Sequence, residues 1–575
     1  MLLQRLIEHA DRLALAPAMY LRTPIRWLVD LDRRGRFLEW VPMEGSSWRH
    51  DRGQEWLAPH VLRTVKIKAK LLADRAEYAL GIPRRADQTA PSKATARHAA
   101  FLRTVAHCAQ VTREPTVQAV LTFLTQADPA HLSLPDGFEA THNVTFRVAG
   151  VLPIDLPSVR AYWATAATGD PAEREGALLG PDARECLGCG TRRPVLTRQP
   201  FKIKRIPGGQ PAGLALSSAY HPAFESYGLK HSLTAPMCRE CAERAAHAVN
   251  ALIDGERTHL TVGPLTCLFW TRGVSTFSPV PFLAHPRVAQ VRALLGGAGP
   301  GRAPARRPSN ALYATALSAH GGRVVVREWI ETTVREAKHH LARYFALQRL
   351  VGPDGRAAPP LKLATLVAGL SRDPAHAMAP QVPLSLLRLA LQGGALPEEL
   401  LYRAVTRNRL EQRVGRPRAA VIKMVLCSGA CPEPEDTLGA LQRQQTDPAY
   451  LCGRLLAVLE AIQRAAFPHA HTGVVDRFYG AASSAPAAVF GPLLSAAQHH
   501  LRKLGRERWP TNLLLRPGLQ ELQRQLPTYP RGLSVAQQGW FALGYYHQRV
   551  ADRAAILARG EANQWAVAAL ESEAE

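Results

Sequence analysis

The sequence has no uninterrupted apolar run that approaches the about 20 residues needed by a membrane-spanning helix. Its first residues, "MLLQRLIEHADRLALA", carry charged side chains throughout their apolar run, whereas a secretory signal peptide has an uncharged apolar segment. These two absences predict a cytoplasmic protein with no membrane partner.

Signatures of common enzymes are missing as well. The chain contains no Gly-x-Ser-x-Gly, no His-Glu-x-x-His and no dinucleotide-binding fingerprint. His50 and Asp51 form a His-Asp dipeptide, but the other ligands of a metal-dependent phosphohydrolase do not follow at a recognisable spacing. We therefore predict a protein that is not an enzyme. A zinc-containing nucleic-acid-processing enzyme that uses His50 and Asp51 is the alternative.

Acidic residues are scarce relative to basic ones. The 47 Asp and Glu stand against 71 Lys and Arg, which gives a formal charge of +24. This excess favours a polyanionic partner, first of all nucleic acid, because binding of phosphates releases counterions. A basic solvated surface without a partner is the other interpretation. The excess lies almost wholly upstream of Met424, since the chain from there on has 14 basic and 13 acidic residues.

The spacing of apolar residues predicts an α+β, multidomain chain. In "PIRWLVDLDRRGRFLEWVPM", alternating apolar residues on either side of Gly35 indicate a β-hairpin. "GGAGPGRAPARRPSN" is too rich in Gly and Pro for regular structure and indicates a linker, and helical spacing dominates from Val324 onward. The predicted domains are a mixed α/β body at 1–180, a zinc-knuckle and basic-loop insertion at 181–295, a linker and helical region at 296–423, and a C-terminal α-helical bundle at 424–575.

The segment "YLCGRLLAVLEAIQRAA", residues 450–466, illustrates the helical pattern of the bundle. Its apolar residues recur every three or four positions. Arg454, Gln463 and Arg464 fall on the opposite side. This pattern predicts a bundle helix that buries a single stripe.

Two cysteine pairs carry the sharpest local signal. The chain has nine cysteines, an odd number, which together with the missing signal peptide favours thiols or metal ligands over disulfides. Cys186 and Cys189 form one Cys-x-x-Cys motif, and Cys238 and Cys241 form a second one, with 48 residues between the two motifs. Four thiolates are a ligand set of structural Zn²⁺ and leave no open position for catalysis. We predict such a zinc site, with ordinary buried thiols as the alternative.

A basic, glycine-rich segment lies between the two cysteine pairs. Its glycines would let the backbone approach a sugar-phosphate edge, and Gln210 could read the edge of a base. A plain hairpin turn in a basic strand is the alternative. The predicted DNA-binding residues here are Arg198, Lys202, Lys204, Arg205, Gly208, Gly209 and Gln210.

A second basic run, "RTVKIKAK", contributes Lys66 and Lys68 to the predicted DNA-binding residues. Its basic side chains alternate along the chain, so a solvated edge strand is the alternative interpretation.

Long segments resemble one known family in the same order along the chain. They are "PIRWLVDLDRRGRFL", "LLADRAEYALG", "PFKIKRIPGGQPAGLALSSAYHPAFESYG", "LTCLFWTRG", "PAYLCGRLLAVLEAIQRAA", "DRFYGAASSAPAAVFGPLLSAAQHHLRKL" and "LSVAQQGWFALGYYHQR". Over nearly its whole length, the chain resembles the large subunit of the type I-C CRISPR surveillance complex, Cascade.

The resemblance implies a subunit without catalytic activity that reads the short PAM (protospacer-adjacent motif) beside a target, helps open the duplex and supports the displaced strand. The implied partners are CRISPR RNA, target double-stranded DNA, the displaced non-target strand, the backbone, guide-processing and small subunits of Cascade, and a helicase-nuclease. A zinc-knuckle scaffold that binds only protein is a third interpretation.

The resemblance also bears on the C-terminal bundle, which in this family is similar to the separate small subunits of Cascade. An internal start within the gene commonly produces such a subunit, and here Met424 is the last methionine. Within the bundle, Arg477, Arg502 and Lys503 are predicted to contact the displaced strand, with a solvated helix face as the alternative.

Overall fold

The computed structural model describes most of the chain, in segments. These are residues 1–13, 19–45, 52–61, 67–84, 90–126, 133–166, 183–217, 219, 222–297, 310–371, 379–429 and 437–572. His50, Asp51, Lys66, most of the predicted linker and the predicted domain boundary near residue 430 lie outside the described residues.

The chain divides into two compact units. Leu3–Phe201 and Ser217–Ala248 form the first unit, and Lys202–Leu216 and Val249–Glu575 form the second. The division into four domains stays a prediction, because compact units do not show which segments fold independently.

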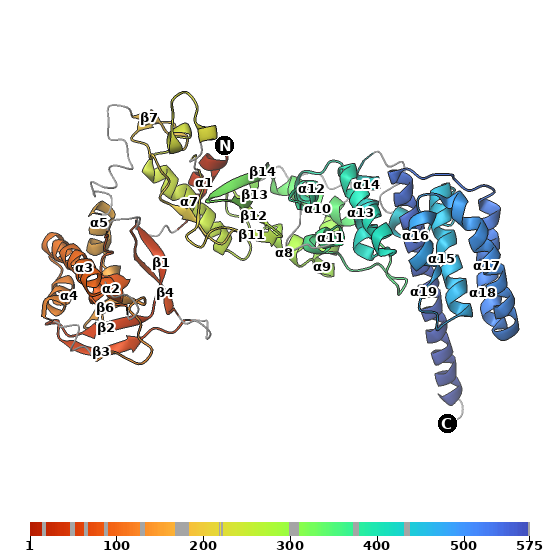
Figure 1. Ribbon diagram of the computed structural model, residues 1–575, viewed down its shortest axis with the longest axis horizontal. Coiled ribbons are helices and arrows are strands. Elements are labelled where there is room, and N and C mark those ends of the chain that lie inside the picture. The colour runs from red at the N-terminus through yellow and green to blue at the C-terminus, as the bar shows by residue number, and fades with distance from the viewer. Residues whose placement is uncertain are drawn as a thin grey trace. The chain divides into compact units, whose positions relative to one another are not determined.

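The first unit contains a four-stranded sheet in the order β3-β2-β6-β5 (Figure 1). The central pair, β2 and β6, is parallel, and both outer pairs are antiparallel. A separate antiparallel pair joins β1 and β4. The strands are β1 (Tyr20–Ile25), β2 (Trp27–Leu31), β3 (Phe37–Pro42), β4 (Gln54–Pro59), β5 (Ala73–Arg75), β6 (Asn143–Val148), β7 (Arg184–Glu185) and β8 (Arg192–Arg193).

The predicted hairpin around Gly35 is confirmed. Val29 of β2 pairs with Trp40 of β3, and Gly35 between them adopts a φ of +81°, which a residue with a Cβ rarely adopts. Trp27, Val29 and Leu31 are buried in the core of this unit, and Leu28 on the opposite face is buried as well, so β2 is buried on both faces.

Helices accompany these strands, and α2 to α5 contribute to the core of the first unit. The helices are α1 (Leu2–Ala10), α2 (Ala76–Ala79), α3 (Ala90–Thr112), α4 (Pro115–Gln126), α5 (Pro157–Ala166) and α7 (Arg239–Asp254), whose residues from Val249 onward belong to the second unit. The core contains Phe101 of α3, Phe123 of α4 and Phe146 of β6.

The second unit begins with a six-stranded sheet in the order β11-β12-β13-β14-β10-β9. All neighbours are antiparallel except β10 and β14. The strands are β9 (Lys202–Ile203), β10 (Leu214–Ala215), β11 (His259–Val262), β12 (Leu265–Thr271), β13 (Ala311–His320) and β14 (Arg323–Thr333).

The prediction of mostly helical structure from Val324 onward fails only for its first residues. Residues from Arg323 to Thr333 form β14, because their β-branched side chains pair along the whole length of β13. The first helix starts at Val334 behind a capping box, in which the Thr333 hydroxyl accepts from the Glu336 amide at 3.2 Å and the Glu336 carboxylate accepts from the Thr333 amide at 3.0 Å.

The remainder of the second unit is helical, and one continuous core runs from the sheet into the C-terminal bundle. The helices are α8 (Val280–Ala284), α9 (Val288–Gly297), α10 (Val334–Leu347), α11 (Leu363–Gly369), α12 (Gln381–Gln392), α13 (Glu398–Glu411), α14 (Arg416–Ser428), α15 (Pro448–Ala466), α16 (Val474–Ala482), α17 (Pro486–Glu507), α18 (Trp509–Gln525) and α19 (Val535–Ser572). The predicted class, an α+β chain with a mixed N-terminal body and a helical C-terminal region, is confirmed. Among the described residues, no helix combines the length and the apolar character needed to cross a membrane.

The predicted bundle helix is α15, which lies beside α19 (Figure 1). The predicted apolar stripe is buried, but the placement of Arg454 on an exposed side is wrong. Arg454 is 4% exposed, and its Nε donates to the Gln548 side-chain oxygen at 3.1 Å. Helices α16 to α19 surround α15, so Arg454 and Glu460 are buried, whereas Gln463 is half-buried and Arg464 is exposed.

Candidate metal centre and nucleic-acid interface

The first cysteine pair lies in the turn between β7 and β8. The Cys186 amide donates to the Thr191 carbonyl at 3.0 Å, and the Gly190 amide donates to the Cys186 carbonyl at 2.8 Å. Gly190 adopts a φ of +70°, which closes the turn and brings Cys189 back toward Cys186.

The second cysteine pair lies at the start of α7 and is joined to the first by backbone hydrogen bonds. The Leu196 amide donates to the Met237 carbonyl at 2.9 Å, beside an antiparallel bridge between Val195 and Cys238. Cys241 lies within the first turn of α7. The chain thus returns after the intervening segment and places the second pair against the first.

The four sulfur atoms of Cys186, Cys189, Cys238 and Cys241 all lie within 4.8 Å of one another. Sulfurs bound to Zn²⁺ at about 2.3 Å in a tetrahedron are about 3.8 Å apart, so the cluster has the size that a zinc ion requires. Cys189 is exposed and the other three are buried. These residues therefore fit a tetrahedral zinc ion at the edge of the first unit.

Backbone donors around the cluster favour thiolates. The amides of Gly188 and Cys238 both donate to the Cys186 sulfur, at 3.3 and 3.2 Å. Hydrogen bonding to Thr191 lowers the pKa of Cys189 to about 6, whereas burial raises the pKa of Cys238 and Cys241. Buried thiols become thiolates readily only beside a positive charge such as a metal ion.

The basic segment forms a β-hairpin, as its alternative interpretation predicts, and its role in DNA binding stays a prediction. Strands β9 and β10 pair in register, with Ile203 opposite Leu214. Within the turn, the Gly209 amide donates to the Ile206 carbonyl at 3.0 Å. Gly208 has a φ of +72°, and no atom lies within 4 Å of the place that a Cβ would take. The turn therefore presents bare backbone to open space.

One asparagine holds the basic hairpin in place. Asn250, near the end of α7, accepts from the Lys204 amide at 3.0 Å and donates to the Lys202 carbonyl at 2.9 Å. Arg205 forms an ion pair with Asp254 one turn later. Sequence reasoning missed Asn250, because a single asparagine in a helix gives no signal of what lies against it.

The basic side chains of the hairpin differ in exposure. Lys204 and Gln210 are exposed, whereas Lys202 is half-buried and its pKa is lowered by burial. Lys204 is therefore the side chain of this turn that can most readily meet a phosphate.

Other predicted DNA-binding residues lie in the first unit. Arg198 is exposed and Lys68 is half-buried. The edge-strand interpretation of Lys68 is wrong, since the described residues 67–70 belong to no strand. They are instead fixed locally, with the Lys70 amide donating to the Asp74 carboxylate at 2.9 Å.

The predicted basic residues of the bundle lie on α16 and α17. Arg477 and Arg502 are exposed. Lys503 is half-buried, with its Nζ 4.0 Å from the centre of the Phe467 ring and 3.9 Å from the Glu507 carboxylate. Its charge is thus shared between a ring face and a carboxylate on its own helix.

The aromatic residues Tyr545, Tyr546 and His547 lie within α19 and are buried. Tyr545 is fully buried and its hydroxyl donates to the Glu460 carboxylate at 2.6 Å. His547 is 2% exposed and lies 3.0 Å from the Tyr450 hydroxyl. Burial lowers the pKa of His547 to about 3, so this imidazole stays neutral at physiological pH.

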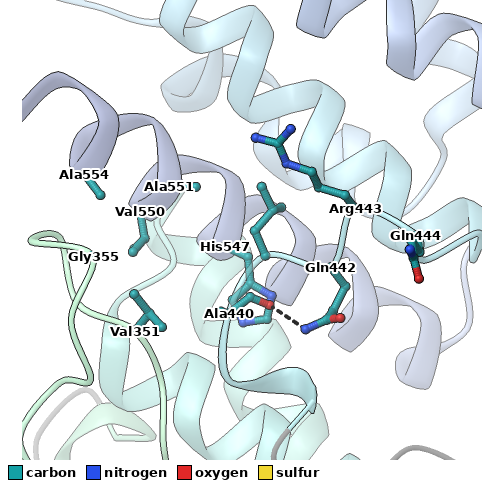
Figure 2. A pocket seen from close by; sticks show the side chains of 11 residues that line it. Val351, Gly355, Ala440, Gln442, Arg443, Gln444, His547, Val550, Ala551 and Ala554 are labelled. Atoms are coloured by element: carbon teal, nitrogen blue, oxygen red, sulfur yellow. Dashed lines mark hydrogen bonds between the residues drawn. The ribbon is translucent and has the colours of Figure 1, made fainter. Parts of the chain in front are cut away.

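A cavity of about 540 Å³ lies between α19 and two loops of the second unit, with His547 in its wall (Figure 2). The Gln442 amide nitrogen donates to the Ala440 carbonyl at 3.3 Å along its rim. Its lining has no carboxylate and no thiol, and its one imidazole is held neutral, so it offers no acid–base pair. The lining residues are Val351, Gly355, Ala440, Leu441, Gln442, Arg443, Gln444, His547, Val550, Ala551 and Ala554.

Fold and site together define a multidomain α+β protein with a four-cysteine cluster and a large helical region. The chain belongs to the family of CRISPR-associated proteins designated Cas_Csd1, whose family model matches residues 3–552. This is the family of the type I-C large subunit, so the resemblance seen in the sequence holds over nearly the whole chain. No curated protein matches the chain.

Proposed function

We propose that this protein is the DNA-binding large subunit of a type I-C Cascade, that it recognises the PAM in target double-stranded DNA, and that it has no catalytic activity of its own. It then promotes unwinding and R-loop formation and supports recruitment of the helicase-nuclease. Its partners are the backbone, guide-processing and small subunits, the CRISPR RNA, the target duplex and the displaced strand.

The observation that carries this proposal is the β9–β10 hairpin. It is basic, contains no acidic residue between Lys202 and Gln210, and ends in a glycine turn that faces open space. In an RNA-guided complex, base pairing reads the target sequence, and the protein reads only a short motif and the shape of the backbone. A turn with an exposed lysine and an exposed side-chain amide can contact one phosphate and one base edge, which is the limited reading that such a complex leaves to the protein.

Lys204 and Gln210, two exposed side chains of the hairpin, have distinct roles in the proposal. The Lys204 ammonium contacts a phosphate, which contributes affinity without sequence preference. The Gln210 amide contacts the edge of a base, which contributes preference. Asn250 positions the hairpin through the backbone of Lys202 and Lys204.

We further propose that Cys186, Cys189, Cys238 and Cys241 hold a structural Zn²⁺ ion. The ion would supply the positive charge that keeps buried thiolates ionised, and it would join the β7–β8 turn to the start of α7. With four cysteine ligands it would have no open position for a substrate.

Two substitutions in the hairpin should separate in their effects on DNA binding. Gln210→Ala should relax the preference for the PAM over a scrambled sequence by the about 1–3 kcal/mol of one base contact. Lys204→Ala should weaken both sequences alike and reduce the salt dependence by about one phosphate contact. Binding of the reconstituted complex to both duplexes at two salt concentrations measures the difference. Equal losses on both duplexes for Gln210→Ala would remove this residue from PAM reading.

We also propose that residues 424–575 can fold as a separate small-subunit-like domain whose Arg477, Arg502 and Lys503 contact the displaced strand. Met424 is buried within α14, and α13 and α14 both pack on α19, so a product starting at Met424 would leave part of α19 uncovered. We expect the isolated fragment to be helical and to melt cooperatively by circular dichroism. Aggregation, or a melt without cooperativity, would contradict independent folding.

A further inference from the structure

The turn that joins β13 to β14 lies directly against the basic hairpin. The Ala215 amide of β10 donates to the Gly322 carbonyl at 2.9 Å, and Ala215 is in register with Arg323. The Gln210 side-chain oxygen lies 3.6 Å from the place that a Cβ on Gly322 would take. Two turns that are far apart in the sequence are therefore side by side at one end of the sheet.

The second turn has the same chemistry as the first. It reads His320, Gly321, Gly322 and Arg323, with His320 exposed and Arg323 half-buried. Gly321 has a φ of +58°, and no atom lies within 4 Å of the place that its Cβ would take. Like Gly208, it presents bare backbone to open space.

The charge of the paired turns is positive. Neither 202–210 nor 320–323 contains an acidic residue. Asp254 compensates Arg205, and this ion pair holds the hairpin to α7. Lys204 and Arg323 are the basic side chains that flank the two glycine turns, and His320 and Gln210 add hydrogen-bonding groups to them.

We propose that the β13–β14 turn is a second DNA-contacting element and that, with the β9–β10 turn, it forms one composite edge that binds the PAM duplex. Arg323 binds a phosphate, and His320 and Gln210 reach base edges while the glycine backbones permit close approach. The inference rests on the proposed function and adds residues that sequence reasoning did not find.

The ligand that fits this edge is duplex DNA rather than a single strand. Sequence-tolerant binding of single strands relies on stacking of bases on aromatic side chains. Neither turn contains Phe, Tyr or Trp. Two narrow, rigid turns with hydrogen-bonding tips match a groove flanked by phosphates.

Substitutions at three positions test the composite edge in the reconstituted complex. Arg323→Gln should weaken binding to PAM and scrambled duplexes alike and reduce the salt dependence by about one phosphate, with recovery in Arg323→Lys. His320→Ala should reduce the PAM preference by roughly 5- to 150-fold, which corresponds to one base contact. Gly322→Ala adds a methyl group in ordinary contact with the Gln210 amide, so the turn should stay folded. The methyl group would cover backbone that the DNA approaches in this proposal, so the PAM preference should fall.

Arg403→Ala is the matched control, because Arg403, like Arg323, is a half-buried arginine, and its partner is Glu399 on its own helix, α13. It should bind both duplexes as the unchanged protein does. If Gln210→Ala lowers the PAM preference and the His320, Gly322 and Arg323 variants behave as Arg403→Ala does, the composite edge is overturned and the proposed function stands. If the unchanged complex binds both duplexes equally, the proposed function fails, and the inference fails with it.

Discussion

Replacing Cys241 with serine should release zinc from the protein, whereas the unchanged chain should carry a stoichiometric amount. Cys241 is buried beside three other sulfurs, and a serine hydroxyl is a much poorer ligand for zinc than a thiolate. Binding of structural zinc contributes about 10–16 kcal/mol in small zinc-binding peptides, so its loss should open the β7–β8 turn and the start of α7. Metal analysis and limited proteolysis of the purified protein measure both effects.

Cys108→Ala is the control for the zinc prediction. Cys108 is a buried thiol of α3 in the same unit, outside the four-cysteine cluster. This variant should keep its zinc and lose only the packing of one small side chain. Retention of zinc by Cys241→Ser, or absence of zinc from the unchanged protein after reconstitution with the metal, would favour the interpretation of the cluster as ordinary buried thiols.

Alanine at Gly453 should lower the free energy of unfolding of the second unit by at least about 3 kcal/mol. Helices α15 and α19 approach there backbone to backbone, and a Cβ on Gly453 would lie 2.0 Å from the Phe541 carbonyl oxygen. Gly544 makes the reciprocal approach, with its Cβ position 2.1 Å from the Tyr450 carbonyl oxygen. Backbone atoms cannot move aside as a flexible side chain can, so the two helices must separate. Thermal or denaturant unfolding measures the change.

Gly518→Ala is the matched control for this crossing. Gly518 also lies within a helix, α18, but no atom lies within 4 Å of its Cβ position. The same substitution should therefore stabilise the protein by roughly 0.5–1 kcal/mol, because alanine favours helix more than glycine does. A Gly453→Ala variant as stable as Gly518→Ala would mean that α15 and α19 do not cross as closely as described.

Local sequence patterns predicted the parts of the structure that depend on neighbours in sequence. The spacing of Cys186 from Cys189 is a property of one turn, and the alternation around Gly35 is a property of one hairpin. The structure has both the turn and the hairpin, because neighbouring residues are enough to determine such local backbone structure.

Features that depend on tertiary contacts could not be predicted in this way. Arg454 was placed on an exposed face because its own helix has a polar side there, yet α19 supplies Gln548 as a partner. Asn250 and the turn at Gly322 were missed because only the folded sheet brings them to the basic hairpin. The candidate DNA-binding edge is thus assembled from segments whose proximity has no local sequence signal.

The most direct test of the central claim is binding of guide-matched duplex DNA to the reconstituted Cascade complex, with and without this subunit. Duplexes with an intact and a scrambled PAM should be compared at two salt concentrations, because phosphate contacts make affinity depend on salt. We predict that tight binding requires both the subunit and the intact PAM. Binding that is equally tight without the subunit, or that ignores the PAM, would contradict the account.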